Sequence, residues 1–351
     1  QLQHGLFTSQ HVTRYTEVMT ATSQEMVEQW ASLPAGSEVS VLAEMGKLTS
    51  EVIARTLFGQ SLGDDTATAV ITTFADFQRA IEQIQFSNFL GLPPWMPFTG
   101  VNMGMARKSA KKLHGIVDGV IASSLKERPK GTLLDGLLSA NEASGGEAIS
   151  LEGIRNELIV LFMAGHETTA NALSWVWYLL SQSPEVEAKL HAELDSVLNG
   201  RLPTYDDYEK LEYTRAVFEE TMRLYPPVPI LSREAGEDDM IRGKAIPKGS
   251  LMLVVPWLLH RHQAYWDNPD HFIPERFLAP NKRPDKFVYL PFSVGPRTCI
   301  GKMFGMVEAV MVIATLAQRF RLTLPQGTEV KHECRLTLRP LGGLPMKLEA
   351  R

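Results

Sequence analysis

The chain has 351 residues, of which 44% are hydrophobic and 21% are charged, and its formal net charge is −5. Such a composition is typical of a globular protein with a large core. The negative charge argues weakly against nucleic acid as a partner, and no uninterrupted run of about 20 apolar residues predicts a membrane span. The two cysteines, Cys299 and Cys334, offer no disulfide framework, so the sequence predicts a reducing compartment such as the cytoplasm.

The N-terminal part of the chain predicts successive helices. Apolar residues recur with helical spacing over 12–30, 41–58, 66–83 and 105–125. Glycine and proline separate these segments, and the stretch 91–97 holds too many prolines for a helix. The polar stretches 126–131 and 141–148 predict exposed connections.

A long helix is expected over 151–182, and it carries polar residues in an apolar setting. Gly165, His166, Glu167, Thr168 and Thr169 lie between two apolar runs. Polar side chains inside such a helix are costly unless they are hydrogen-bonded. One interpretation is a polar stripe that faces a crevice, with the threonines bonded to their own helix. The other is an acid–alcohol pair that serves a bound ligand.

Two further helices, 184–198 and 208–224, precede a region of short strands. The strands are expected at 228–233, 251–256, 320–324, 336–339 and 346–349. The stretch 266–291 is rich in proline and aromatic residues and predicts irregular but packed structure. Since no repeat or linker divides the chain, we expect a mainly α fold with a minor β portion (α+β), in a single domain over residues 1–351.

Two groups of charged residues in this half need interpretation. Glu220 and Arg223 lie on one helix face, where such a pair is ordinarily an exposed ion pair worth a few tenths of a kcal/mol. His260 and His262 have the His-x-His spacing of some metal sites. We exclude a metal site there because the nearest acids lie among turn residues and no cysteine is close in the sequence.

Cys299 ends a glycine-punctuated loop directly before an apolar helix expected over 303–320. A lone cysteine in such a protein is usually a small buried apolar residue. Here Gly295 and Gly301 permit tight turns, and free N–H groups with the helix dipole favour a thiolate. Arg297 offers a cation for a carboxylate such as a haem propionate. This loop therefore suits a cysteine that binds haem iron as an axial ligand.

Four motifs, in a fixed order, carry a resemblance to a known family. The loop reads Phe-x-x-Gly-x-Arg-x-Cys-x-Gly from Phe292 to Gly301, and the long helix holds Ala-Gly-His-Glu-Thr-Thr over 164–169. Between them lie Glu-Thr-Met-Arg over 220–223 and Pro-Glu-Arg-Phe over 274–277. In these motifs, over essentially the whole chain, the sequence resembles the cytochrome P450 family, the haem–thiolate monooxygenases, in particular bacterial members with eukaryote-like helix motifs.

The resemblance implies a haem b cofactor whose iron takes Cys299 as its axial thiolate, with Phe292 shielding the sulfur. It implies that Gly165 opens a groove for dioxygen, the co-substrate, at the haem. It further implies that Thr168 hydrogen-bonds the oxygen and that Glu167 relays protons through water. His166 is expected to line the groove and not to bind the metal.

Other residues receive supporting roles from the same resemblance. Glu220, Arg223 and Arg276 are expected to form a buried structural network behind the cysteine loop. Arg233 stands where the family often has an arginine for a haem propionate, although an ordinary strand-end cation is an equal alternative. The expected pocket walls are mostly aliphatic, with members at Leu161, Phe162, Ala164, Val228, Ile230 and 341–344.

The implied activity is insertion of one oxygen atom of dioxygen into a small apolar organic substrate. The chain has no flavin or iron–sulfur motif, so electrons must come from a separate ferredoxin or flavoprotein reductase. Two alternatives are a haem–thiolate enzyme that uses peroxide and a haem-binding remnant without activity. We find no counterpart of the family's early sheet and early helices, so we expect an N-terminally truncated sequence whose missing part could carry a membrane anchor.

Overall fold

The computed structural model describes residues 9–89, 103–143, 145, 150–281 and 284–351. The predicted loop over 91–97 lies outside these residues. Five helices form the first part of the chain: α1 (Ser9–Ala31), α2 (Val41–Phe58), α3 (Asp64–Phe89), α4 (Met103–Glu127) and α5 (Leu133–Ala143). Five more follow: α6 (Leu151–Ser181), α7 (Pro184–Leu198), α8 (Glu212–Leu224), α9 (Pro256–Leu259) and α10 (Lys302–Ala317). The expected mainly α class is confirmed.

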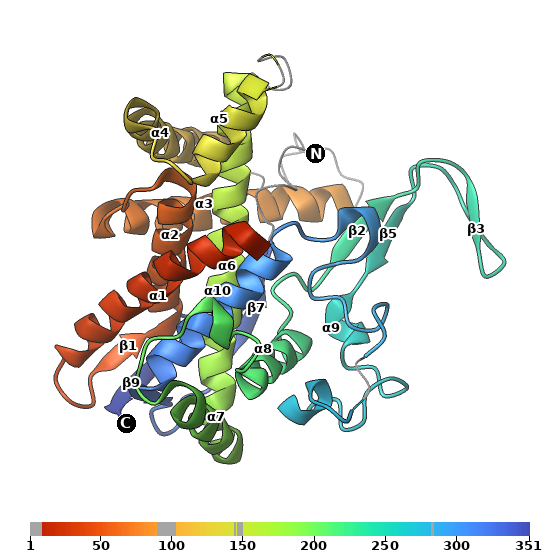
Figure 1. Cartoon of the computed structure of the whole chain (residues 1–351). Helices are drawn as coiled ribbons and strands as arrows, with labels where there is room; N and C mark the ends of the chain where they lie inside the picture. Colours follow the sequence, from red (N-terminus) through yellow and green to blue (C-terminus); the bar gives the residue numbers. More distant parts are fainter. Residues whose placement is uncertain (1–8, 90–102, 144, 146–149, 282–283) are drawn as a thin grey trace.

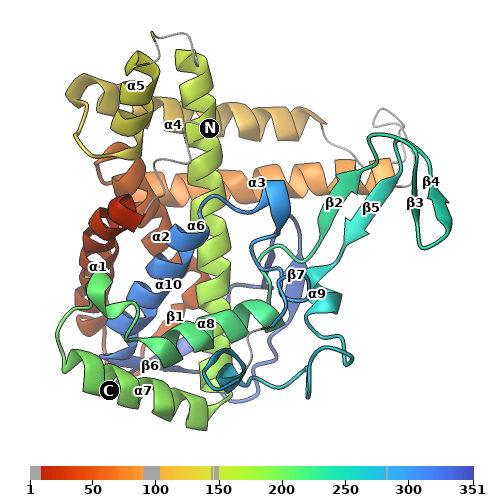
Figure 2. The same cartoon turned by 45° about the vertical axis from the view of Figure 1, so that its right-hand side comes forward.

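The long helix α6 runs through the molecule, and the other helices are arranged about it (Figures 1 and 2). It begins at Ser150, whose hydroxyl accepts the Gly153 N–H at 3.0 Å, as an N-cap residue does. α2, α8 and α10 all pack against α6. From Phe304 to Ala317 nearly every residue of α10 is buried, which is what an all-round apolar helix requires. α6 and α10 therefore form the two central elements of the core.

Four small antiparallel sheets lie beside the helices. The largest has the order β1-β9-β6 and joins β1 (Glu38–Ser40), β9 (Pro345–Ala350) and β6 (Phe320–Thr323). The others pair β2 (Leu231–Glu234) with β5 (Leu251–Val254), β3 (Asp239–Ile241) with β4 (Lys244–Ile246), and β7 (His332–Cys334) with β8 (Leu338–Pro340). The β3–β4 hairpin projects from the helical body (Figure 1).

The sequence predicted some of these strands and missed others. Each of the five expected strands has a counterpart in β2, β5, β6, β8 or β9. β1, β3, β4 and β7 were not predicted, because three residues are too few to show an alternating pattern. The expected strand 251–256 ends earlier, at Val254, since Pro256 begins α9, where a proline at the first helical position is favoured.

Two chain-wide expectations can be compared with this structure. Most buried apolar side chains between α1 and β9 form one cluster, while the division of the chain into domains stays a prediction. Within the part of the chain that the structure describes, no helix is long and apolar enough to cross a membrane. Cys299 and Cys334 are not joined by a disulfide.

Candidate active site

The cysteine loop is a tight backbone structure that leads into α10. A short 3-10 turn covers Gly295–Arg297, and Gly295 has a positive φ of 75°. The Cys299 N–H donates to the Phe292 carbonyl at 2.9 Å, which closes the loop. A Cβ at Gly301 would lie 3.9 Å from Cys299 Sγ, an ordinary van der Waals contact. Of the two glycines, Gly295 is therefore the one whose backbone conformation favours glycine.

Cys299 is exposed, and its thiol lines a cavity whose nearby protein atoms partly desolvate it. This desolvation raises the pKa of the thiol, and a hydrogen bond from the Gly301 N–H opposes the rise. A free thiol is therefore protonated at neutral pH in this setting. Coordination to a metal cation deprotonates a thiol outright, so the loop suits a sulfur that becomes a thiolate on binding iron.

The cavity before Cys299 has a volume of about 280 Å³ and lies between the cysteine loop and α6. Phe292, Arg297 and Cys299 line one side, and Ala164 and Thr168 of α6 line the other. The Thr168 hydroxyl donates to the Ala164 carbonyl at 2.7 Å. Residues separated by more than a hundred positions in sequence thus face a single space.

A second cavity, of about 430 Å³, adjoins the first. The two share Ala164, Thr168 and Val228 in their walls. The second is lined mostly by apolar residues of α3, α4 and α6, and Glu167 also reaches it. It therefore offers an apolar space for a small organic molecule next to Thr168.

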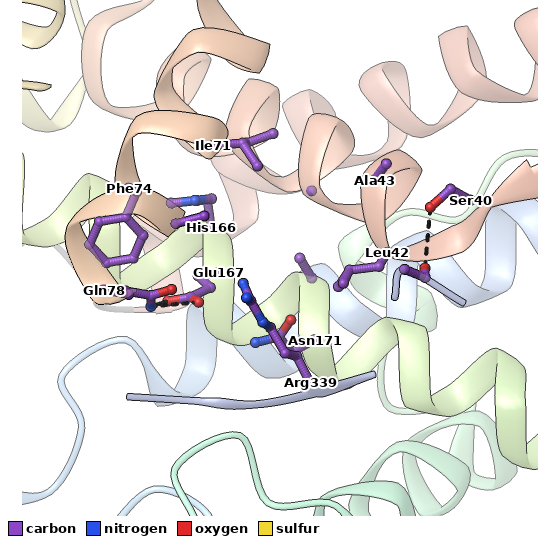
Figure 3. Close-up of a pocket in the computed structure, with 14 residues that line it drawn as sticks. Ser40, Leu42, Ala43, Ile71, Phe74, Gln78, His166, Glu167, Asn171 and Arg339 are labelled. Atoms are coloured by element: carbon purple, nitrogen blue, oxygen red, sulfur yellow. Dashed lines mark hydrogen bonds between the residues drawn. The ribbon is translucent and has the colours of Figure 1, made fainter. Parts of the chain in front are cut away.

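Glu167 lies between this second cavity and a third pocket of about 200 Å³ on the α2 and α3 side of α6 (Figure 3). Gln78 Nε2 donates to both oxygens of its carboxylate, at 2.7 and 2.8 Å, and the Thr337 hydroxyl donates at 2.9 Å. Burial raises the pKa of Glu167, and these hydrogen bonds oppose the rise. Because Glu167 lines both spaces, its carboxyl can exchange protons with either.

Two predicted cofactor residues do not line the cavity beside Cys299. Gly165 faces α2, where a Cβ would come within 3.1 Å of Ile53, so the glycine allows α2 and α6 to approach closely. Ala164 takes the cavity position instead. Arg233 lies exposed on β2, and its guanidinium donates to the neighbouring Ser232 carbonyl at 2.8 Å.

The expected pocket walls are only partly right. Ala164 and Val228 line the cavities, but Phe162 is buried against Phe58 of α2, and Ile230 is exposed. Successive helix residues point in different directions, so neighbours in sequence do not share a wall. The α6 residues that face the second cavity are spaced at helical intervals: Ile159, Val160, Met163, Ala164, Glu167 and Thr168.

Glu220, Arg223 and Arg276 form a hydrogen-bonded cluster behind the cysteine loop. Arg223 donates to both oxygens of Glu220, at 2.7 and 2.8 Å, and both side chains are fully buried. Arg276 Nε donates to the same carboxylate at 3.3 Å. The remaining Arg223 N–H groups donate to the backbone carbonyls of residues 260, 269 and 271. The pair is thus a buried junction, not the exposed ion pair that its spacing alone suggests.

His260 connects this cluster to the cysteine loop, a role that the sequence analysis missed. Its carbonyl accepts Arg223 Nη1 at 2.8 Å, and its Nε2 accepts the Leu290 N–H at 2.8 Å. Leu290 stands two residues before Phe292, whose carbonyl holds the Cys299 N–H. No group of three or more His, Cys, Asp or Glu side chains that could hold a metal ion is found in the described segments.

Because Nε2 accepts a hydrogen bond, His260 must be neutral, and burial lowers its pKa to about 4. The unfolded chain takes up this proton near pH 6.5. The free energy of unfolding should therefore fall by about 3 kcal/mol as the pH drops from about 6.5 to 4. We expect His260→Gln, which keeps an acceptor but does not titrate, to lose this part of the acid sensitivity, and His260→Ala to cost about 1–3 kcal/mol at pH 7.

Urea denaturation across this pH range measures both effects. His262→Gln is the control, because His262 is exposed on the same turn. An acid sensitivity of His260→Gln equal to that of the unsubstituted protein would contradict the assignment.

The residues around the first cavity fit a haem. A thiol and a guanidinium, the two groups that suit an iron ion and a propionate, come from one loop and line the same space. The remaining walls are mostly apolar, as a porphyrin requires, and include Ala172, Phe218, Met222, Pro227, Val228 and Leu231. The donor chemistry and the lining thus agree with a haem–thiolate enzyme.

Comparisons with known proteins give the same class. The family model "Cytochrome P450" matches residues 2–345. The chain is 33% identical to cyclooctatin synthase from Streptomyces melanosporofaciens over 98% of this chain and 75% of that protein. It is 34% identical to putative cytochrome P450 132 from Mycobacterium bovis, over 90% and 70%. It is 32% identical to cyclooctat-9-en-7-ol 5-monooxygenase from Streptomyces melanosporofaciens, over 98% and 74%.

The chain therefore belongs to the cytochrome P450 family. It is accordingly an oxidoreductase, a haem-dependent monooxygenase that uses dioxygen. The family and the monooxygenase-type relatives do not specify the substrate or the electron donor of this chain.

Proposed function

We propose that this protein inserts one oxygen atom of dioxygen into an apolar organic substrate, at a haem b held by Cys299. The observation that carries the proposal is that the cavity at Cys299 and the apolar second cavity share Ala164, Thr168 and Val228 in their walls. The two cysteines form no Cys-x-x-Cys-His motif for covalent attachment, which favours haem b over a c-type haem. Bound there, the haem would supply the activation of dioxygen and the oxygen transfer.

The chain's own residues would then have separate tasks. Cys299 would supply the thiolate that holds the haem iron, and Arg297 would pair with a propionate. The Thr168 hydroxyl stands where the walls of the two cavities meet. Its proton goes to the Ala164 carbonyl, so its oxygen can accept a hydrogen bond from a group in the cavity. Glu167 takes protons from the third pocket and passes them toward Thr168, through water in the second cavity. One of the two oxygen atoms leaves as water, which requires two protons and two electrons in each cycle.

The substrate class follows from the second cavity, which is lined mainly by aliphatic and aromatic side chains. One relative acts, by its name, on cyclooctat-9-en-7-ol, an unsaturated alcohol. Terpenoid, fatty acid or polyketide-like molecules fit this lining. The haem spin state of the holoenzyme, followed while such compounds are added, would show which of them bind beside the iron.

The electron donor is proposed to be a separate ferredoxin or flavoprotein reductase. The sequence contains no iron–sulfur or flavin motif. Reconstitution with and without each donor tests this: product should require a donor protein. Product formed from hydrogen peroxide alone, at the rate of the reconstituted system, would favour the peroxide-using alternative.

Removal of the Glu167 carboxylate should impair proton delivery without emptying the haem cavity. We expect Glu167→Gln to lower the rate of product formation by about 10²-fold or more, the range of general acid–base catalysis, and to release more of the consumed oxygen as hydrogen peroxide. Glu152→Gln, an exposed position in the first turn of the same helix, is the control. A Glu167→Gln enzyme with unchanged product per electron consumed would exclude this role.

A further inference from the structure

Glu308 of α10 is a buried carboxyl group that the proposed mechanism does not use. Its side chain is 1% exposed. Neither oxygen has a partner with good hydrogen-bond geometry among the described residues. An isolated ionised carboxylate in such a place costs so much free energy that the group usually takes up a proton instead. Its position therefore requires a physical explanation.

Glu308 lies directly behind the wall of the haem cavity. Gly305, one turn earlier on α10, and Thr169 of α6 both line that cavity together with Cys299. The Thr169 hydroxyl lies 3.9 Å from where a Cβ of Gly305 would stand. Thr169 also approaches Glu308 closely enough to oppose the effect of burial on its carboxyl group. The Glu308 carboxyl therefore lies next to a threonine of the cavity wall.

Burial raises the pKa of Glu308 to about 8, and the Thr169 hydroxyl keeps it from rising further. No charged residue among those described shifts this pKa. The elements packed on α10 are α1, α6, α8 and β6. Among the described residues of these elements, the buried ionisable side chains include Tyr15 of α1, His166 of α6, and Glu219, Glu220 and Arg223 of α8. Arg321 of β6 is partly exposed and is paired with Glu187.

We propose that Glu308 takes up one proton from solvent when the haem beside Cys299 accepts one electron from the redox partner. The proton converts the carboxylate to the acid, no other bond changes, and the net charge of the buried site stays constant. The electrostatic reason is that an electron added nearby, in a medium of low effective dielectric, raises the affinity of the carboxylate for a proton. This proposal rests on the haem being bound at Cys299.

The test is the pH dependence of the reduction potential of the haem-loaded protein, titrated with dithionite between pH 6 and 10. One proton taken up with one electron lowers the potential by up to about 59 mV for each tenfold fall in proton activity. We expect this slope around and above pH 8 in the unsubstituted protein. We expect its loss in Glu308→Gln, and its retention in the control Glu185→Gln, which removes an exposed carboxylate of α7. An unchanged slope in Glu308→Gln would overturn the proposal.

Two further measurements test the proposal by routes that do not depend on the potential of Glu308→Gln. Thr169→Val removes the hydroxyl that lowers the pKa of Glu308, so the pH at which the reduction potential begins to fall should move upward. If that pH did not move, the result would count against the proposal. This variant still tests the proposal if Glu308→Gln does not fold. The stability of the haem-free protein tests separately whether Glu308 titrates. Because the folded pKa lies above the unfolded one, stability should be lost as the pH rises from about 4.5 to 8, and Glu308→Gln should not show that loss.

The reduction potential and the stability of the haem-free protein distinguish a failure of this proposal from a failure of the proposed function. A pH-dependent stability without a pH-dependent potential would mean that Glu308 titrates but is not coupled to the haem, which overturns the proposal. Failure of the unsubstituted chain to show a haem–thiolate spectrum would instead contradict the proposed function.

Discussion

Replacement of Cys299 by alanine or histidine is expected to abolish the long-wavelength absorption band that a haem–thiolate protein shows when reduced and bound to carbon monoxide. Among the described residues that line the cavity, Cys299 supplies the only thiol. Alanine leaves the iron without a protein ligand from this loop, and imidazole donates less electron density to the metal than a thiolate does. Product formation should be lost together with the band.

Cys334 provides the matched control. It lies on β7, exposed, and it does not line the cavity. Cys334→Ala should therefore keep both the band and the activity. If Cys299→His kept the band, or if Cys334→Ala lost it, the axial assignment would be wrong.

Arg223→Met is expected to destabilise the protein by about 3–5 kcal/mol, the cost of leaving one partner of a buried ion pair uncompensated. The substitution removes both hydrogen bonds to Glu220 and three donors to backbone carbonyls. Since one of those carbonyls belongs to His260, which holds the chain before the cysteine loop, haem retention should fall as well. Urea denaturation and the haem content of the purified protein measure the two effects.

Arg215→Met is the control on the same helix. Arg215 pairs with Glu209, whose side chain is 76% exposed, and such exposed pairs contribute about 0–1 kcal/mol. The double variant Glu220→Leu/Arg223→Met should recover part of the loss. It also removes the buried carboxylate, which Arg223→Met leaves with Arg276 at 3.3 Å, but it does not restore donors to the backbone carbonyls. Equal stabilities of Arg223→Met and Arg215→Met would contradict a structural role for the cluster.

The sequence predicted the helices better than the strands because their patterns differ in length. α6 and α10 are long, and their apolar residues give a clear pattern over many turns. The strands of three residues have no such pattern, and they exist because another segment lies beside them. β1, for example, pairs with β9 across some 300 residues of chain, in the register Glu38↔Lys347.

In the candidate site, too, the sequence showed local patterns but not the contacts between distant segments. The motifs marked Thr168, Glu167 and Cys299 because their residue types are unusual in their local surroundings. The motifs could not show that Glu167 is held by Gln78 of α3 and Thr337 near β8, which lie 89 and 170 residues away. They also suggested a groove at Gly165, whereas the helix rotation turns that glycine toward Ile53.

The sequence by itself determined the fold class and the family, and it predicts the chemistry of the cysteine loop, because short-range patterns of glycine, cysteine and apolar residues carry that information. Only the tertiary structure decided which face of α6 meets the cavity, how His260 joins the buried cluster to the cysteine loop, and that Glu308 lies without a strong partner behind the cavity wall. These features depend on the rotation and packing of elements that are far apart in the chain. Neighbouring residues in sequence do not specify them.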